Sequence, residues 1–305
     1  MNLETLFDRF ARTVEERRLH VEGIAAADEK KLLLERRFTP DRPRNIYSHT
    51  KSYMVTAAGM AMADGLLSLD DRLADYFPEK LPSHPQEAIF SITLRHLLTM
   101  SSGFGRALLM GQDRRAGAGL PDYMAYMLAQ PVAETPGSRF CYSTADSILA
   151  ARMIEKAVGC RLSAYLYNRL FSKLGQGFPI WECDAEGHPC GGGGLYLSLT
   201  EMLKLGQLYL SGGVWQGERL LEESWVREAT RKQIETDNPA DFWNCGYGYQ
   251  FWMSPYPGAY RADGAFGQVT TVLPEKGLVV AVQCPEEGDF DQVKRALHEE
   301  ILTQL

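Results

Sequence analysis

Apolar and polar positions along the chain predict one amphipathic helix at each end. Between residues 3 and 17, apolar side chains recur at the helical spacing of three and four residues, at Leu3, Leu6, Phe7, Phe10 and Val14. A second amphipathic helix is expected over about residues 289–302. A single apolar face needs a surface to cover, so we expect the first helix to lie on a sheet.

Five runs of strand character stand next to these helices. They cover about residues 19–26, 31–37, 246–253, 266–273 and 278–283, and short turns join the first two runs and the last two. Two of the runs lie near the start of the chain and three near its end. A single sheet must therefore gather strands from both ends of the chain.

The region between these strands has a helical pattern. From residue 46 to about residue 230, glycines and prolines interrupt apolar periodic segments, and no long alternating run occurs. Ser198 and Glu201 form a capping box that begins one of these helices. We expect one α+β domain with an antiparallel five-stranded sheet, flanking terminal helices and a large inserted helical lobe. The α/β lobe would comprise about residues 1–45 and 230–305, and the helical lobe about residues 46–229.

Charge and composition narrow the choice of partners. The 305 residues are 45% hydrophobic and 23% charged, with a net charge of -7, which argues against a nucleic-acid partner. The first 20 residues lack the basic head and apolar segment of a signal peptide, and no apolar stretch approaches membrane-spanning length. We therefore expect a cytoplasmic protein without a membrane partner.

The cysteines do not indicate a disulfide framework or a cofactor. Six cysteines are scattered without a CxxC pair, which suggests free thiols in a cytoplasmic protein. Cys183, His188 and Cys190 are zinc ligands by type, but their spacing lacks the paired geometry of metal sites. Solvated loop residues are the favoured interpretation, and we expect neither a metal nor a cofactor.

Ser48 and Lys51 form the first candidate for chemistry. Ser48 stands where an apolar helix begins, and a separation of three residues places Lys51 on the same helical face. A serine hydroxyl needs a positioned base before it becomes a nucleophile, and a nearby lysine can supply one. The pair alone is weak, since about one such match is expected by chance. A capping serine beside a solvated lysine is the alternative.

Two further segments could complete an acyl-transfer site. Tyr142 stands at the junction between a turn and a helix, where a close lysine could alter its proton affinity. Alone, it would more often be a packing residue. Glycines crowd residues 262–268 before a strand, so a backbone amide there could approach a ligand and stabilise an oxyanion. The alternative for this segment is an ordinary β-bulge.

In chain order, these segments resemble the serine β-lactamase-like family. It includes class C β-lactamases, penicillin-binding carboxypeptidases, family VIII esterases and 6-aminohexanoate-oligomer hydrolases. The resemblance covers nearly the whole chain and rests on the Ser-x-x-Lys motif and on residues 65–71, 92–103, 136–140 and 262–268. It implies Ser48 as nucleophile, Lys51 as proton acceptor and Tyr142 as proton shuttle. The implied oxyanion hole is the backbone amides of Ser48 and Ala265.

Two departures from the family pattern bear on the substrate. Thr144 stands where many β-lactamases and peptidases have an asparagine that holds the acylamino group. Residues 262–264 read Ala-Asp-Gly where those enzymes have Lys-Thr-Gly, so a substrate carboxylate would meet Asp263. We therefore expect esters or simple amides as substrates of a serine hydrolase, and Asp263 could favour substrates with an amino group.

Other residues are weaker substrate-binding candidates, and two other functions remain open. Pocket roles are possible for Thr144, Asp263, Gly264, Phe266, Trp181, Tyr247 and Tyr249. Aromatic residues at strand spacing are more often core. The first alternative function is a β-lactamase or a D-Ala-D-Ala carboxypeptidase-type penicillin-binding protein. The second is a non-catalytic binding protein that retains the fold.

Overall fold

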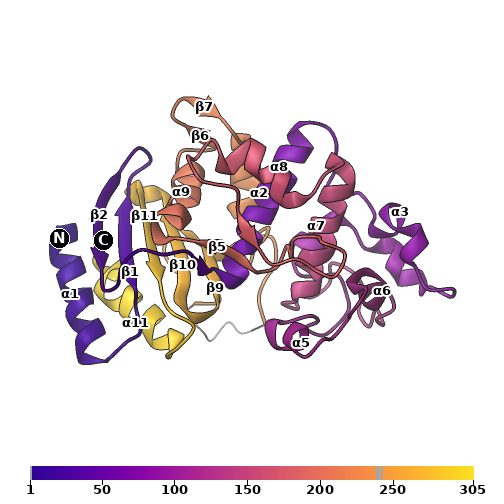
Figure 1. Ribbon diagram of the computed structural model, residues 1–305, viewed down its shortest axis with the longest axis horizontal. Helices are drawn as coiled ribbons and strands as arrows, with labels where there is room; N and C mark the ends of the chain where they lie inside the picture. Colours follow the sequence, from indigo (N-terminus) through magenta and orange to yellow (C-terminus); the bar gives the residue numbers. More distant parts are fainter. Residues whose placement is uncertain (1, 238–240, 242) are drawn as a thin grey trace.

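The computed structural model describes residues 2–237, 241 and 243–305. Its main sheet is antiparallel and has the strand order β2-β1-β11-β10-β9-β8. Strands from the two ends of the chain lie side by side in it, as Figure 1 shows. Their bounds are Gly23–Ala27 (β1), Leu32–Arg37 (β2), Trp252–Met253 (β8), Tyr260–Gly264 (β9), Gln268–Leu273 (β10) and Leu278–Gln283 (β11).

The α+β fold expected from the sequence is confirmed, with six strands described in the main sheet instead of five. The additional strand is β9, which the sequence analysis treated as a glycine-rich approach to the next strand. The predicted strand over 246–253 is reduced to β8, because residues 246–251 form a loop. Two smaller sheets contain β3 (Arg44–Asn45), β4 (Ile180–Trp181), β5 (Leu195–Leu197), β6 (Val214–Trp215) and β7 (Glu218–Arg219).

The terminal helices α1 (Leu3–Glu16) and α11 (Phe290–Glu300) cover one face of the main sheet. In β11, Val280 and Val282 point to this face and share an apolar core with Phe7 and Phe10 of α1. Successive side chains of a strand point to opposite faces, so Val279 and its neighbours two residues apart face the other side. The centre of the sheet is therefore buried on both faces, whereas the edge strand β2 is partly exposed.

Helix α9 (Leu199–Leu210) covers the opposite face of the sheet, and its predicted capping box is present. A Cβ atom added to Gly206 would lie 2.5 Å from Val279 and 2.8 Å from Thr270. Glycine thus permits this helix to approach the strands closely. The larger of the two principal apolar cores continues from here into the helical region.

The helical region lies beside the sheet, on the right of Figure 1. Helices α2 and α7 pack against each other at its centre. The bounds of its helices are Thr50–Ala63 (α2), Leu73–Tyr76 (α3), Leu94–Leu98 (α4), Gly111–Arg115 (α5), Tyr123–Leu128 (α6), Thr144–Val158 (α7), Leu162–Leu166 (α8) and Glu223–Thr230 (α10).

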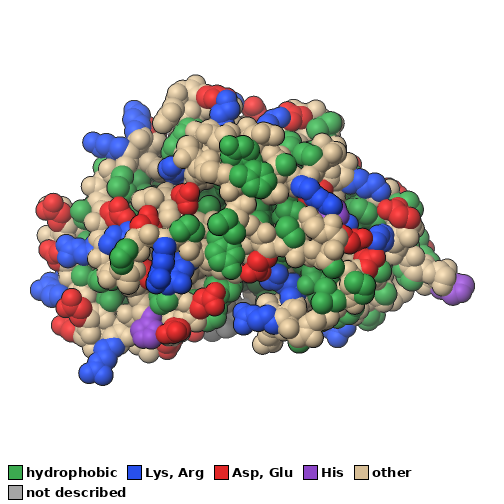
Figure 2. Space-filling model, viewed as in Figure 1, with side chains coloured by type: hydrophobic (Ala, Val, Ile, Leu, Met, Phe, Trp, Pro, Cys, Tyr) green, Lys and Arg blue, Asp and Glu red, His purple; other side chains and the backbone are tan. Residues whose placement is uncertain are grey.

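Acidic and basic side chains are interspersed over the face of the molecule drawn in Figure 2. This face therefore carries no extended patch of one sign, in keeping with a net charge of -7 distributed over many residues. Among the described residues, no helix combines the length and apolar character required to cross a membrane.

Candidate active site

A strained turn presents Ser48 at the edge of the helical region. Ser48 belongs to the 3₁₀ helix Tyr47–His49, which leads directly into α2. The backbone of Tyr47 has a φ of 49°, in the left-handed region that non-glycine residues rarely adopt. The side chain of Asn45 accepts a hydrogen bond from the Tyr47 amide at 2.8 Å and thereby supports this conformation. Local strain of this kind is frequent where a chain positions a reactive group.

The predicted pair of Ser48 and Lys51 is formed. Lys51 Nζ donates a hydrogen bond to Ser48 Oγ at 3.1 Å and a second one to the carbonyl oxygen of Gly192 at 2.6 Å. The lysine side chain is almost completely buried, because α2 is enclosed by the rest of the protein along most of its length. Lys51 is therefore not the solvated surface lysine of the alternative interpretation.

Burial changes the proton affinity of Lys51. It disfavours the charged ammonium and is the main cause that lowers the pKa of Lys51 to about 7. Cys190 and Asp146 oppose this shift, while the positive charge of Arg114 adds to it. A substantial fraction of Lys51 is consequently neutral near pH 7 and can accept a proton.

Tyr142 lies on the other side of this pair, just before α7. Lys51 Nζ is 5.1 Å from the centre of the Tyr142 ring, and Tyr142 also forms a side-chain hydrogen bond with Ser48. Burial raises the pKa of Tyr142 well above its usual value, and the hydrogen bond with Ser48 opposes this only in part. Its phenol therefore remains protonated at neutral pH and can donate a proton.

The end of β9 reaches the Ser48 turn through a glycine. A Cβ atom added to Gly264 would lie 2.1 Å from the carbonyl oxygen of Ile46 and 3.1 Å from the amide nitrogen of His49. Two backbones can approach this closely only where the side chain is a hydrogen atom. The next residue, Ala265, begins a 3₁₀ turn and is thereby placed at the same pocket as Ser48.

The pocket around Ser48 has a volume of about 460 Å³. Four of the predicted residues line it, namely Ser48, Thr144, Ala265 and Phe266. The other residues that line it are Tyr47, Met110, Gly111, Gln112, Arg114, Arg115, Gly192 and Gly193. Lys51 and Tyr142 are not part of this lining, but both form hydrogen bonds with Ser48.

Three of the predicted aromatic residues, Trp181, Tyr247 and Tyr249, do not line this pocket. Trp181 is buried and donates from its indole nitrogen to the carbonyl oxygens of Cys190 and Gly193, at 2.8 and 3.1 Å. Tyr247 is buried edge-on against Tyr142, with 6.2 Å between ring centres. Tyr249 stacks on Trp225 in the core. Of these three side chains, Tyr247 contacts a proposed catalytic residue, Tyr142.

Asp263 and Gly264 also lie outside the lining of the pocket. The carboxylate of Asp263 accepts a hydrogen bond from Arg261 Nε at 2.9 Å and another from the indole nitrogen of Trp243 at 3.3 Å. The buried guanidinium of Arg261 thus balances its charge. The charge of Asp263 that the sequence analysis placed before the substrate is directed into the protein.

Three contributors to the site were missed by the sequence analysis. Gly192 presents its carbonyl oxygen to Lys51, and a Cβ at this position would lie 2.7 Å from Thr144 and 3.3 Å from Lys51 Nζ. The signal for it was the run of four glycines at 191–194. Arg114 and Arg115 line the pocket from α5, and only their adjacency in the sequence could have drawn attention to them.

The described residues form no cluster of ligands that would support the zinc alternative. Among the residues that the structure describes, no group of three or more His, Cys, Asp and Glu side chains is arranged to hold a metal ion. The ring of His188 contacts the carboxylate of Glu155 and the guanidinium of Arg161.

Comparisons with known proteins agree with this architecture. Esterase EstB of Burkholderia gladioli is 31% identical over 140 residues, which cover 42% of this chain and 36% of the esterase. A monacolin J acid methylbutanoyltransferase of Aspergillus terreus is 29% identical over 155 residues, which cover 44% of this chain and 37% of that enzyme. The matches thus span little more than a third of the length of these curated relatives.

A solved structure supports the fold over the whole chain. The octameric penicillin-binding protein homologue from Pyrococcus abyssi aligns with a TM-score of 0.74 and 21% identity, covering 98% of this chain and 77% of that one. The β-lactamase family model matches residues 10–303. The chain therefore belongs to the β-lactamase family.

Proposed function

We propose that this protein is a serine hydrolase that acts on esters or simple amides through a covalent acyl-enzyme at Ser48. The observation that carries the proposal is the hydrogen bond between Ser48 Oγ and the buried Lys51, whose pKa of about 7 suits a general base. The curated relatives are an esterase and an acyltransferase by name, and both of these activities transfer an acyl group.

Acylation begins when Ser48 Oγ attacks the carbonyl carbon of the substrate and Lys51 accepts the hydroxyl proton. The backbone amides of Ser48 and Ala265 stabilise the oxyanion that develops on the carbonyl oxygen. As this intermediate collapses, the bond to the leaving alcohol or amine breaks and the leaving group takes a proton from Tyr142. Lys51 returns its proton to Tyr142, which leaves an acyl group on Ser48.

Deacylation repeats these steps with water. The water oxygen attacks the acyl carbon while Lys51, acting through Tyr142, accepts a proton. The bond to Ser48 Oγ then breaks, the oxygen is reprotonated, and the carboxylic acid leaves. The contacts of Lys51 with Ser48 and with the Tyr142 ring, and of Tyr142 with Ser48, support these roles for the protein groups.

Esters and simple amides fit the pocket better than penicillins do. Thr144 lines the pocket and has no carboxamide with which to hold an acylamino group. Ala262 occupies the position of the lysine that binds the substrate carboxylate in Lys-Thr-Gly enzymes. A penicillin would lack both contacts, so we propose that its turnover is slow.

Release of nitrophenol from a short-chain p-nitrophenyl ester tests this function, with wild type and Ser48→Ala compared under identical conditions. We expect turnover by the wild type alone. Thermal unfolding serves as the folding control. Replacing a serine at a helix start by alanine lowers the free energy of unfolding by about 1 kcal/mol or less, so the variant should remain folded. Equal rates for both proteins would refute the role of Ser48, and rapid cephalosporin turnover would instead favour a β-lactamase.

A cytoplasmic location stays a prediction.

A further inference from the structure

The pocket beside Ser48 is positively charged although the chain as a whole is acidic. Of the twelve described residues that line it, two carry a charge, and both are arginines: Arg114 and Arg115 of α5. We propose that the pocket recognises esters or amides that bear an anionic group, such as a carboxylate, and that Arg115 binds this group with Arg114 beside it. This inference rests on the proposed hydrolase function and specifies its class of substrate.

Arg115 is available to a ligand. Its side chain is exposed, and its guanidinium forms no ion pair or hydrogen bond with any residue in the described part of the chain. A planar guanidinium can bind a carboxylate with two parallel hydrogen bonds, which gives orientation as well as affinity. An arginine at the edge of the pocket can therefore hold the far end of a substrate while its carbonyl carbon lies at Ser48.

Arg114 is less exposed than Arg115 and lies against the glycine loop, residues 190–194. Its Nη1 atom contacts Cys190 Sγ at 3.2 Å and lies 3.8 Å from a carboxylate oxygen of Glu182. Its Nε atom is buried without a hydrogen-bond partner in the protein. Buried donors are seldom left unpaired, so part of the Arg114 guanidinium is not neutralised by hydrogen bonds within the protein.

Acidic residues near the arginines already have other partners. A neighbouring pocket of about 500 Å³ shares both arginines and is also lined by Glu182, Asp184 and Glu286. Glu182 accepts a hydrogen bond from Asn45 at 3.1 Å, Asp184 pairs with Arg152 at 2.9 Å, and Glu286 is hydrogen-bonded to Tyr47. None of these acids lines the pocket that contains Ser48.

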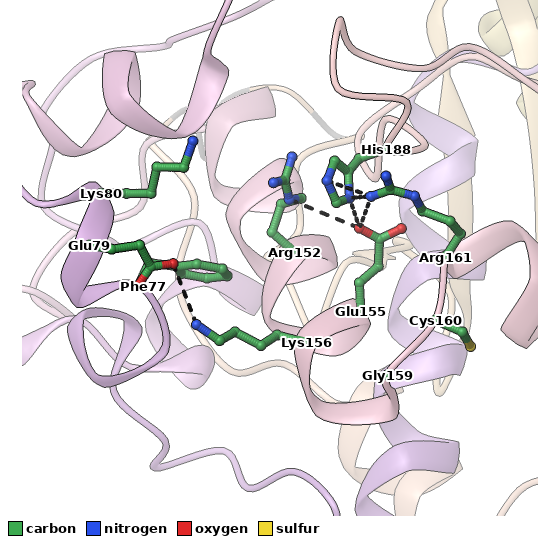
Figure 3. Close-up of a pocket in the computed structure, with 10 residues that line it drawn as sticks. All are labelled: Phe77, Glu79, Lys80, Arg152, Glu155, Lys156, Gly159, Cys160, Arg161 and His188. Carbon is green, nitrogen blue, oxygen red and sulfur yellow. Dashed lines mark hydrogen bonds and ion pairs between the residues drawn. The ribbon is translucent and has the colours of Figure 1, made fainter.

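A second cavity, shown in Figure 3, provides a contrast. It has a volume of about 440 Å³ and is lined by four cations and two acids, together with His188. Each of these cations has an acidic partner: Lys80 pairs with Asp122, Arg152 with Asp184, Lys156 with Glu79 and Arg161 with Glu155. An anion would have to displace an existing partner there. In the Ser48 pocket, Arg114 has Glu182 at 3.8 Å, whereas Arg115 has no ion pair within the described part of the chain.

The position of Asp263 removes the main objection to an anionic substrate. A carboxylate in the pocket would not meet this side chain, because Asp263 is paired with the buried Arg261 and lies outside the lining. The arginines of α5 thus supply an attractive charge from an element other than β9, where the Lys-Thr-Gly enzymes carry their lysine.

Two matched series of esters test the inference. In the first, the charge is on the acyl side: p-nitrophenyl esters of adipate, hexanoate and 6-aminohexanoate are anionic, neutral and cationic at equal chain length. In the second it is on the alcohol side, with acetate esters of 4-hydroxybenzoate and 4-hydroxybenzamide. The quantity compared is the ratio of kcat/KM for the anionic ester to that for the neutral one.

Arg115→Gln is the test variant, and Arg115→Lys restores the charge without the planar group. Arg227→Gln is the matched control, because it causes the same change in net charge at an exposed site on α10. In at least one series, we expect the wild-type ratio to exceed one and to fall about tenfold in Arg115→Gln, the usual effect of losing a charged hydrogen bond. Arg115→Lys should recover part of it, and Arg227→Gln should match the wild type.

Failure of the inference can be distinguished from failure of the proposed function. Ser48-dependent hydrolysis with the same ratio in wild type and Arg115→Gln, in both series, would overturn the anion site and leave the hydrolase intact. Absence of Ser48-dependent hydrolysis for every ester would overturn both. Thermal unfolding of each variant confirms folding, which Arg115→Gln should not alter because the side chain is exposed.

Discussion

The amino group of Lys51 lies 3.1 Å from Ser48 Oγ, and the lysine is almost completely buried, as is most of α2. This relationship determines the chemistry of the site. A solvated lysine would hold its proton at neutral pH, whereas a buried one gives it up readily enough to serve as a base. The same burial keeps the neighbouring phenol of Tyr142 protonated.

Activity should rise with pH around neutrality. Catalysis needs neutral Lys51, and because its pKa is about 7, kcat/KM should increase from pH 5.5, reach half of its maximum near pH 7 and level off above pH 8. Lys51→Arg stays protonated at every pH in this range and should be inactive throughout. A wild-type profile that is flat from pH 5.5 to 9 would rule out Lys51 as the base.

Tyr142→Phe should lower kcat strongly and KM little. The substitution keeps the ring that packs against Trp252, with 5.4 Å between ring centres, and removes only the hydroxyl that exchanges protons. Loss of a general acid-base group typically reduces turnover by about 10²–10⁴-fold. Steady-state kinetics measure this, and a kcat close to that of the wild type would assign Tyr142 to packing alone.

Asp146 should make stability depend on pH. It is buried in α7, its carboxylate accepts a hydrogen bond from Ser102 Oγ at 2.8 Å, and burial raises its pKa to about 7. The folded state therefore binds more protons than the unfolded state between about pH 4 and pH 7. The stability that Asp146 contributes is fully present below about pH 4 and is lost as the pH rises through about 7.

Asp146→Asn removes this titration at nearly constant volume. Relative to the wild type, the variant should gain more than about 1 kcal/mol of unfolding free energy between pH 5 and pH 8. Urea unfolding of both proteins at the two pH values measures the change. A difference between the proteins that stays the same at both pH values would show that the carboxyl is already ionised at pH 5.

Gly264→Ala should damage stability and activity together. Its new methyl group would lie 2.1 Å from the carbonyl oxygen of Ile46, so the backbone beside Ser48 has to move. Overpacking of this kind costs about 1–3 kcal/mol, and the displaced turn should lower kcat/KM. Gly177→Ala is the matched control, since a Cβ there meets no atom within 4 Å. Equal melting temperatures for the two variants would contradict the close approach.

Most of the fold could be predicted from local sequence patterns, but strand β9 could not. The amphipathic helices α1 and α11 and the capping box of α9 agree with their predicted positions. Strand β9 was missed because it contains Arg261 and Asp263, which look like surface residues in the sequence. They are stabilised by their mutual ion pair and by the Trp243 ring, 4.5 Å from the Arg261 guanidinium.

The site is predictable to the extent that its residues are close in sequence or belong to a motif. Ser48 and Lys51 share a helical turn, so their contact follows from spacing alone. Arg115 reaches the pocket through a five-residue helix in a region without periodic pattern, and no local feature fixes where such a helix packs. Trp181 was expected in the pocket, but two carbonyl acceptors of the glycine loop hold its indole in the interior.

The central claim is that Ser48 becomes acylated, and mass spectrometry of the digested protein tests it most directly. The protein is mixed with p-nitrophenyl acetate, quenched in acid within the first turnovers, and digested for peptide mapping. The account predicts one added acetyl group on the peptide that contains Ser48, its disappearance as turnover ends, and none in Ser48→Ala. Steady hydrolysis by the wild type with acetyl groups only on other residues, or with the same labelling in Ser48→Ala, would contradict it.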